Sequence, residues 1–232
     1  MRLQDISKEI RVPSSTVLRF LNTLMKHDYV SQEPQTSRYF LTLKLCEIGQ
    51  LISAQMSIRD IVRPYLVALS EKCQESACLA VEQDNLVVYI DVVEGPDSML
   101  KTLQRIGKRA PLHSTGVGKT LLLDFSEERL NQLIRDQGLK AITKNTLTTK
   151  QKLLCELARV REQGYAVDNE ECEYGVKCVA APLKDYSGKI AASISVSGPL
   201  SRLPDEKIDF IKERVLETSR KISKHLGFES LS

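Results

Sequence analysis

Apolar positions at the start of the chain recur first at helical spacing and then in alternation. This pattern predicts a short amphipathic helix over residues 2–11 and a second helix over 15–26, separated by Pro13, which cannot continue a helix. The second helix is expected to bury one apolar stripe, formed by Val17, Leu18, Leu21, Leu24 and Met25. Alternating apolar residues on both sides of the turn-rich segment SQEPQTS then predict a β-hairpin. Helix, turn, helix and hairpin within about 45 residues is the layout of a winged helix-turn-helix.

Beyond this segment the period of the pattern changes several times. Helical spacing continues from Leu43 to Lys72, where Pro64 is expected to mark a break or the first turn of a new helix. Alternation predicts strands in ACLAVEQ, LVVYIDVVE, SMLKTLQ, GVKCVAAPLKD and KIAASISVSG. Further helices are expected near 116–124, 126–137, 149–163 and 204–225. This order predicts an α+β fold in which helices pack on a mostly antiparallel sheet.

The same changes of pattern divide the chain into three expected parts. Residues 1–44 would form the winged helix-turn-helix, 45–58 a linker helix, and 59–232 a larger α/β domain. There is no apolar run as long as a membrane span, and the start MRLQDISKEI lacks the apolar core of a secretion signal. A cytoplasmic protein is therefore expected.

Cysteine and histidine spacing gives little support for a metal or cofactor site. The six cysteines include no C-x-x-C pair, and without a secretion signal they are expected to be reduced thiols. The three histidines do not cluster. We therefore expect neither a metal site nor a cofactor.

Positive charge is concentrated at the N-terminal end of the chain. Residues 1–44 contain seven Lys or Arg against four Asp or Glu, which accounts for the whole net charge of +3. Such an excess favours a polyanionic partner, and the second predicted helix has a polar face that could enter the major groove of double-stranded DNA. The expected DNA contacts are Ser14 just before that helix, Ser15, Thr16, Arg19 and Asn22 on it, and Arg38 in the hairpin. The alternative is an ordinary helical hairpin with a solvated face.

The segment STGVGKT at 114–120 resembles a P-loop but lacks its first glycine, which would stand at His113. The preceding KRAPL is not a buried strand, so we reject a nucleotide triphosphatase. Gly116 and Gly118 open an apolar helix, where backbone N–H groups could receive a carboxylate. The alternative is a glycine-rich turn that serves packing only.

The segments DNEECEYGVKC at 168–178 and SISVSG at 193–198 form a third candidate site. The carboxylates could bind metal or perform acid–base chemistry, but no histidine accompanies them, and such a run is more often a solvated edge. Ser193, Ser195 and Ser197 share one face of a strand, with Cys178 on a neighbouring strand. They predict a small polar pocket or, alternatively, a serine-rich edge facing water. No G-x-S-x-G elbow supports a serine hydrolase.

Three blocks of the chain together resemble the IclR (isocitrate lyase regulator) family of bacterial transcription factors. They are SSTVLRFLNTLMKHDYV with its wing through RYFLTLKLCEIG, then PLHSTGVGKTLL, and GYAVDNEECEYGVKCVAAPLKDYSGKIAASISVSGP. The resemblance implies a winged helix-turn-helix joined by a linker helix to a GAF/PAS-like effector-binding domain. It also implies a homodimer or homotetramer, and many similar proteins are repressors.

In similar proteins the effector pocket holds small carboxylates such as glyoxylate, pyruvate or sugar-derived keto acids. Carried onto this sequence, the effector-binding residues are Gly116, Val117, Asp168, Cys178, Ser195 and Ser197. Two features depart from the family: the helix that precedes its helix-turn-helix is expected to be missing in part, and Asp28 stands where glycine is usual. The wing and linker are most similar to the branch that regulates pectin and 2-keto-3-deoxygluconate use.

The sequence thus predicts a DNA-binding transcriptional regulator, a repressor rather than an activator, that is not an enzyme. Its operator is expected to be roughly palindromic, and a small carboxylate or keto acid is expected to control operator affinity. Two alternatives stay open. One is a metabolite-sensing module without DNA binding, and the other is a small-molecule enzyme that uses Asp168 and Cys178.

Overall fold

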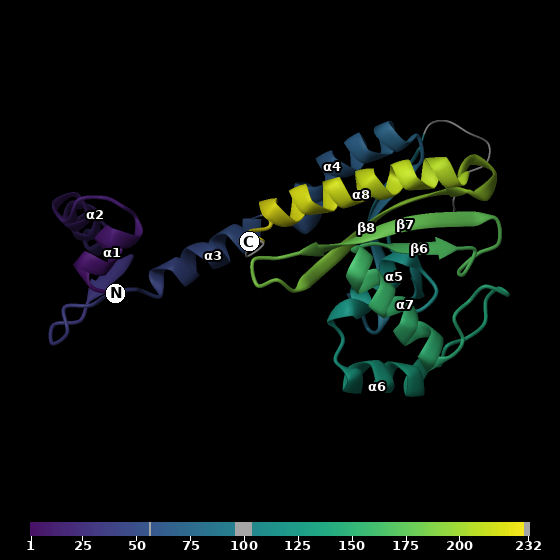
Figure 1. The fold of residues 1–232 in the computed structure, drawn as a ribbon, viewed down its shortest axis with the longest axis horizontal. Helices are drawn as coiled ribbons and strands as arrows, with labels where there is room; N and C mark the ends of the chain where they lie inside the picture. Colours follow the sequence, from purple (N-terminus) through teal and green to yellow (C-terminus); the bar gives the residue numbers. More distant parts are fainter. Residues whose placement is uncertain (56, 96–103, 230–232) are drawn as a thin grey trace. The chain divides into compact units, whose positions relative to one another are not determined.

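The computed structural model describes residues 1–55, 57–95 and 104–229. Their contacts separate two compact units, unit 1 over Met1–Ser57 and unit 2 over Ile58–Ser232 (Figure 1). No helix within the described ranges is long and apolar enough to cross a membrane.

Unit 1 is a helix-turn-helix followed by a short antiparallel hairpin. Its elements are α1 (Leu3–Glu9), α2 (Ser14–Lys26), β1 (Val30–Gln32), β2 (Tyr39–Leu41) and α3 (Lys44–Gln55). The hairpin register runs from Val30 opposite Leu41 to Gln32 opposite Tyr39. A small core joins α2 to the hairpin through Val17, Leu21, Val30 and Tyr39. The predicted winged helix-turn-helix is therefore confirmed.

The apolar stripe predicted for α2 is wider than the one that the structure buries. Val17 and Leu21 are buried and Met25 packs against them, but Leu18 is 38% and Leu24 40% exposed. The prediction for Leu18 and Leu24 was wrong because α1 and the hairpin cover only one narrow face of α2. The exposed apolar surface of unit 1 also includes Phe20, Phe40, Leu41 and Leu43.

Unit 2 is built on a six-stranded sheet with the order β5-β4-β3-β8-β7-β6, in which every neighbouring pair is antiparallel. The strands are β3 (Ser76–Gln83), β4 (Leu86–Val93), β5 (Arg109–Pro111), β6 (Ala166–Asn169), β7 (Val176–Lys184) and β8 (Ile190–Pro199). The central strands β3, β7 and β8 are buried along most of their length because helices cover both faces of the sheet.

Helices cover the two faces of this sheet separately (Figure 1). One face carries α4 (Ile58–Cys73) and α8 (Asp205–His225), and the other carries α5 (Gly116–Leu121), α6 (Glu127–Gln137) and α7 (Lys150–Gln163). Two 3₁₀ turns follow α5 and β8, over Leu122–Asp124 and Leu200–Arg202. Each face has its own apolar core. The predicted α+β architecture is confirmed.

Two local predictions for unit 2 need comment, and two short strands were missed. Pro64 neither breaks nor begins a helix, because it lies inside α4. The helix tolerates the lost N–H because Val62, Leu66 and Leu69 anchor it on the sheet. The predicted strand SMLKTLQ falls almost wholly on residues 96–103, outside the described residues. The short strands β5 and β6 were not predicted, since neither is long enough to show alternation.

Candidate nucleic-acid interface and small-molecule cavity

The first turns of α2 present the polar surface that the sequence predicted. Ser15, Arg19 and Asn22 are exposed, whereas Ser14 and Thr16 are half-buried. They are displayed because Val17 and Leu21, on the opposite side of the helix, pack into the core of unit 1. Arg19 forms no ion pair with any residue that the structure describes, so its guanidinium is available to an anion.

The hairpin places one more cation at the surface of unit 1. Arg38 is exposed just before β2, and its backbone carbonyl accepts a hydrogen bond from the Glu33 amide at 2.9 Å. The hydroxyl of Thr36 donates to the Glu33 carboxylate, and Ser37 adopts a positive φ of 54°. These contacts fix the turn and hold Arg38 at its base.

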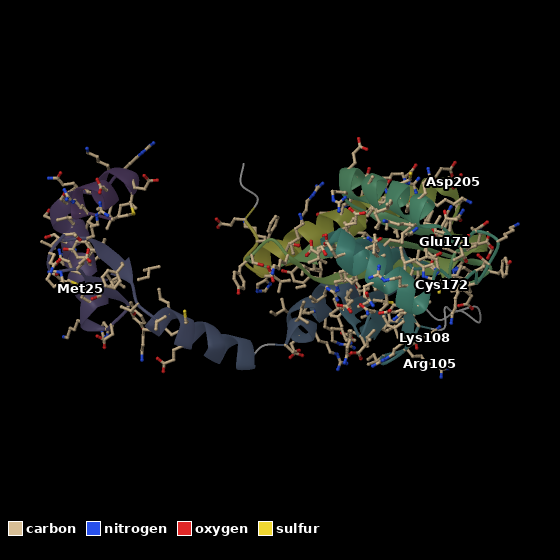
Figure 2. All side chains as sticks on the ribbon, turned by 90° about the horizontal axis from the view of Figure 1, so that it is seen from below. Met25, Arg105, Lys108, Glu171, Cys172 and Asp205 are labelled. Atoms are coloured by element: carbon tan, nitrogen blue, oxygen red, sulfur yellow. The ribbon has the colours of Figure 1, made fainter. Side chains whose placement is uncertain are left out.

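Unit 2 encloses a small cavity of about 40 Å³ between α5 and the sheet. Three of the six predicted effector-binding residues line it, namely Gly116, Asp168 and Cys178; Val117, Ser195 and Ser197 are buried nearby but do not line it. The remaining lining residues were not predicted: Tyr89, Gln104, Lys108, Ala110, Thr115, Cys172, Glu173 and Val176. Figure 2 shows Lys108 and Cys172 at the same end of unit 2.

Strand pairing brings the sulfur and hydroxyl groups of this site together. On β8, Ser195 lies opposite Cys78 of β3, and Ser197 lies opposite Cys178 of β7. All of these side chains are buried, which excludes the alternative of a serine-rich edge facing water. These hydroxyl and thiol groups are therefore gathered inside the fold, although Ser195 and Ser197 do not line the cavity itself.

The glycines of STGVGKT let α5 approach the sheet closely. A Cβ at Gly116 would lie 3.3 Å from the Cys178 sulfur, and a Cβ at Gly118 would overlap the Leu112 carbonyl oxygen. Thr115 caps the helix by accepting the Gly118 amide at 3.1 Å. Gly118 thus serves packing, as the alternative interpretation held, whereas Gly116 borders the cavity.

Asp168 lies at the wall of the cavity with its carboxyl group almost fully buried. Its Oδ1 accepts the Glu171 amide at 2.7 Å and the Cys172 amide at 3.4 Å. Burial raises the pKa of Asp168 to about 7, against the lowering effect of these amides. Near neutral pH the carboxyl group is therefore divided between a neutral form that can donate a hydrogen bond and a charged form that cannot.

Lys119 was not predicted as part of the site, yet its ammonium group binds the acidic segment directly. Its fully buried Nζ donates to Glu171 Oε1 at 2.5 Å, Val167 O at 2.6 Å and Glu156 Oε1 at 3.1 Å. The interpretation of DNEECE as a solvated edge was therefore wrong at Asp168 and Glu171, although Glu173 is exposed. The signal that could have indicated the contact with Glu171 is a lysine in the middle of a short helix that begins with glycine and is otherwise mostly apolar.

A much larger cavity of about 940 Å³ lies elsewhere in unit 2. It is bordered by the end of α7, the β7–β8 turn and the last turns of α8, and none of the predicted site residues lines it. We assign the candidate site to the small cavity, because that is where buried donors and a titratable carboxyl group converge. Among the described residues no cluster of His, Cys, Asp and Glu could hold a metal ion.

Comparison with known proteins gives consistent matches over both units. Residues 1–34 match the family described as "IclR helix-turn-helix domain", and residues 50–224 match "Bacterial transcriptional regulator IclR C-terminal". The transcriptional regulator XynR of Escherichia coli is 33% identical over 98% of this chain and 90% of its own length. KdgR of the same organism, which represents the branch that the wing and linker resemble, is 35% identical over 97% of this chain and 86% of its own length.

A repressor and a solved structure extend these matches. The transcriptional repressor AllR of E. coli is 34% identical over 98% of this chain and 84% of its own length. The crystal structure of the Thermotoga maritima IclR has a TM-score of 0.70 and 32% identity, covering 98% of this chain and 92% of that one. These similar proteins are transcriptional regulators and not enzymes.

Proposed function

Because this chain belongs to the IclR family of bacterial transcriptional regulators and carries its DNA-binding helix-turn-helix, we propose that it is a repressor controlled by a small carboxylate or keto acid. The observation that carries the proposal is the pairing of two features within one chain. Unit 1 displays a polar, cationic start of α2, and unit 2 holds a small cavity lined in part by buried polar side chains. In this proposal residues 1–44 bind DNA, 45–58 link, and 59–232 sense the effector.

The proposed DNA contact uses the exposed start of α2 in the major groove. Arg19 would pair with a guanine edge or a phosphate, and Ser15 and Asn22 would contact neighbouring bases or phosphates. Arg38 would reach the DNA backbone from the hairpin. A homodimer would place two such helices about one turn, roughly 34–36 Å, apart along a nearly palindromic operator. The exposed apolar side chains of unit 1, such as Phe20 and Leu24, favour an association between copies.

The proposed effector contact uses the small cavity of unit 2. Lys108, Thr115 and Asp168 line it, so a positive charge, a hydroxyl group and a protonatable carboxyl group all border the same space. A carboxylate bound there would accept a hydrogen bond from neutral Asp168 and would be attracted by the Lys108 ammonium group. The predicted contributions of Val117, Ser195 and Ser197 stay proposals, because these residues lie behind the cavity wall.

Replacing Arg19 tests the DNA half of the proposal. We expect Arg19→Ala to lower affinity for DNA from the operator region by about 1–3 kcal/mol, while effector binding is unchanged. The measurement is fluorescence anisotropy at matched salt, with Glu9→Ala of α1 as a control for a general change of surface. Equal operator affinity of Arg19→Ala and the natural chain would show that α2 is not the recognition helix.

A further inference from the structure

The side chain of Gln104 accepts hydrogen bonds from two donors beside the proposed effector site. Gln104 lines the cavity, and its Oε1 accepts a hydrogen bond from Ser197 Oγ at 2.8 Å. The Cys78 thiol donates to the same oxygen. Two donors from two adjacent strands, β3 and β8, therefore converge on one carbonyl oxygen of Gln104.

This arrangement explains why the predicted serines do not line the cavity. Gln104 lies between Ser197 and the enclosed space, so the serine hydroxyl is used before a ligand can reach it. The space left, about 40 Å³, matches only a few water molecules at roughly 10–15 Å³ each, which is tight for even a three-carbon keto acid.

A second hydroxyl group, on Ser195, lies beside Cys78. Ser195 Oγ is completely buried and interacts with the Cys78 and Cys178 thiols, but it forms no well-aligned hydrogen bond with a described residue. A thiol is a weak hydrogen-bond partner, so a carboxylate oxygen would be a stronger acceptor for this hydroxyl group. Ser195 and Ser197 are two residues apart on one face of β8, so one carboxylate could span both hydroxyl groups.

We propose that the Gln104 side chain is a plug, meaning that it fills part of the effector cavity in the absence of ligand. The effector's carboxylate displaces this side chain and accepts the hydrogen bonds that Ser197 and Cys78 donate to it. The proposal rests on the proposed function and adds a selection rule to it. A ligand must offer an oxygen acceptor at least as good as an amide carbonyl, which a carboxylate does and an apolar or purely cationic molecule does not. Ser195 then gains a stronger acceptor than the two thiols beside it.

The plug should lower the apparent affinity for the effector. Effector binds only the fraction of molecules in which Gln104 has moved aside, so the apparent affinity is lower than the intrinsic one by that fraction. Removing the plug should therefore tighten binding, although it deletes a residue of the cavity wall. If Gln104 instead contacts the ligand directly, the same substitution would weaken binding.

One experiment tests the plug without any ligand. In the full-length chain, Gln104→Ala is expected to raise the rate at which methyl methanethiosulfonate labels Cys78 by about tenfold or more, followed by peptide mass spectrometry. Cys73, buried on the opposite face of the sheet, is the internal control and should keep its rate. Gln151→Ala, which shortens an exposed glutamine of α7, is the matched variant and should change neither rate. An unchanged Cys78 rate in Gln104→Ala would overturn the proposal.

A second measurement shows whether removing the Gln104 side chain tightens or weakens ligand binding. By titration calorimetry with pyruvate, Gln104→Ala is expected to bind about fivefold or more tightly than the natural chain, and Gln104→Glu more weakly, because its carboxylate competes better for the same donors. Weaker pyruvate binding by Gln104→Ala would overturn the plug. If Cys78 labelling rises while neither protein binds pyruvate or any other small carboxylate, the plug stands and the proposed effector class fails.

Discussion

Asp168 is the residue at which the chemistry of the cavity depends most directly on pH. Its pKa is raised to about 7, first by burial and also by the nearby Glu171 carboxylate, while Lys119 and two amides act in the opposite direction. Three other titratable groups of the wall, Tyr89, Cys172 and Cys178, have pKa values raised by burial and stay protonated near neutrality. The wall also contains the exposed side chains of Lys108 and Glu173. Asp168 is thus a buried wall group whose pKa lies in the physiological range.

This placement predicts a pH dependence of carboxylate binding with a definite sign. Below pH 7 Asp168 is neutral and donates to the ligand; as pH rises through 7 it ionises and repels the ligand. Affinity for pyruvate should therefore fall by up to about tenfold per pH unit above 7. Calorimetry between pH 6 and 8.5 measures it, and Asp168→Asn, which stays neutral, should flatten the profile. A profile that is equally steep in Asp168→Asn would assign the titration to another group.

At the scale of elements, α5 is fixed to the acidic segment and to α7 by one buried ammonium group. Lys119 joins Glu171, which follows β6, to Glu156 of α7, and the same turn supplies the amides that hold Asp168. Losing the cation would leave the buried Glu171 carboxylate without its ion-pair partner, which is strongly unfavourable, whereas Glu156 would keep its ion pair with Arg159 at 2.7 Å. The network therefore connects the cavity wall to α7, and we expect its disruption to destabilise both.

Lys119→Met is expected to destabilise unit 2 by about 3–5 kcal/mol. Hydrogen exchange of the β7 and β8 amides reports the stability of this unit separately from unit 1. Lys150→Met is the matched control, because Lys150 pairs with Glu127 at 3.3 Å on the surface and should change stability by less than about 1 kcal/mol. Adding Glu156→Gln and Glu171→Gln to Lys119→Met should recover part of the loss. If the two lysine variants lowered the stability of unit 2 equally, the buried network would contribute no more to stability than a surface ion pair.

The elements differ in how far the sequence predicts them. The helices of unit 1, its hairpin and the inward face of β8 follow from local periodicity, because each is decided by residues close in sequence. Lys119 and Gln104 could not be assigned in this way. Their contacts reach Glu171, 52 residues away, and Ser197, 93 residues away, so only the folded sheet brings them together. Leu18 and Leu24 were misassigned for a related reason, since their exposure depends on how much of α2 the rest of unit 1 covers.

At the scale of the whole molecule, the proposal requires that the two units act on each other through linkage. An effector that prefers one arrangement of the dimer shifts operator affinity by the same factor by which DNA shifts effector affinity. Typical couplings of about 1–3 kcal/mol correspond to changes of 5–150-fold. The helix-turn-helix of the IclR family binds DNA, and the coupling free energy between effector and DNA determines how strongly the effector controls that binding.

The most direct measurement is the operator affinity of the full-length chain with and without effector. A small carboxylate is first selected by thermal shift from a panel of pyruvate, glyoxylate and sugar-derived keto acids, and anisotropy then measures binding to labelled operator DNA. The account predicts a 5–150-fold weaker operator affinity in saturating effector, and no change in an Asp168→Ala/Ser195→Ala variant that has lost the thermal shift. Operator binding that is identical with and without a carboxylate that demonstrably binds would contradict the central claim.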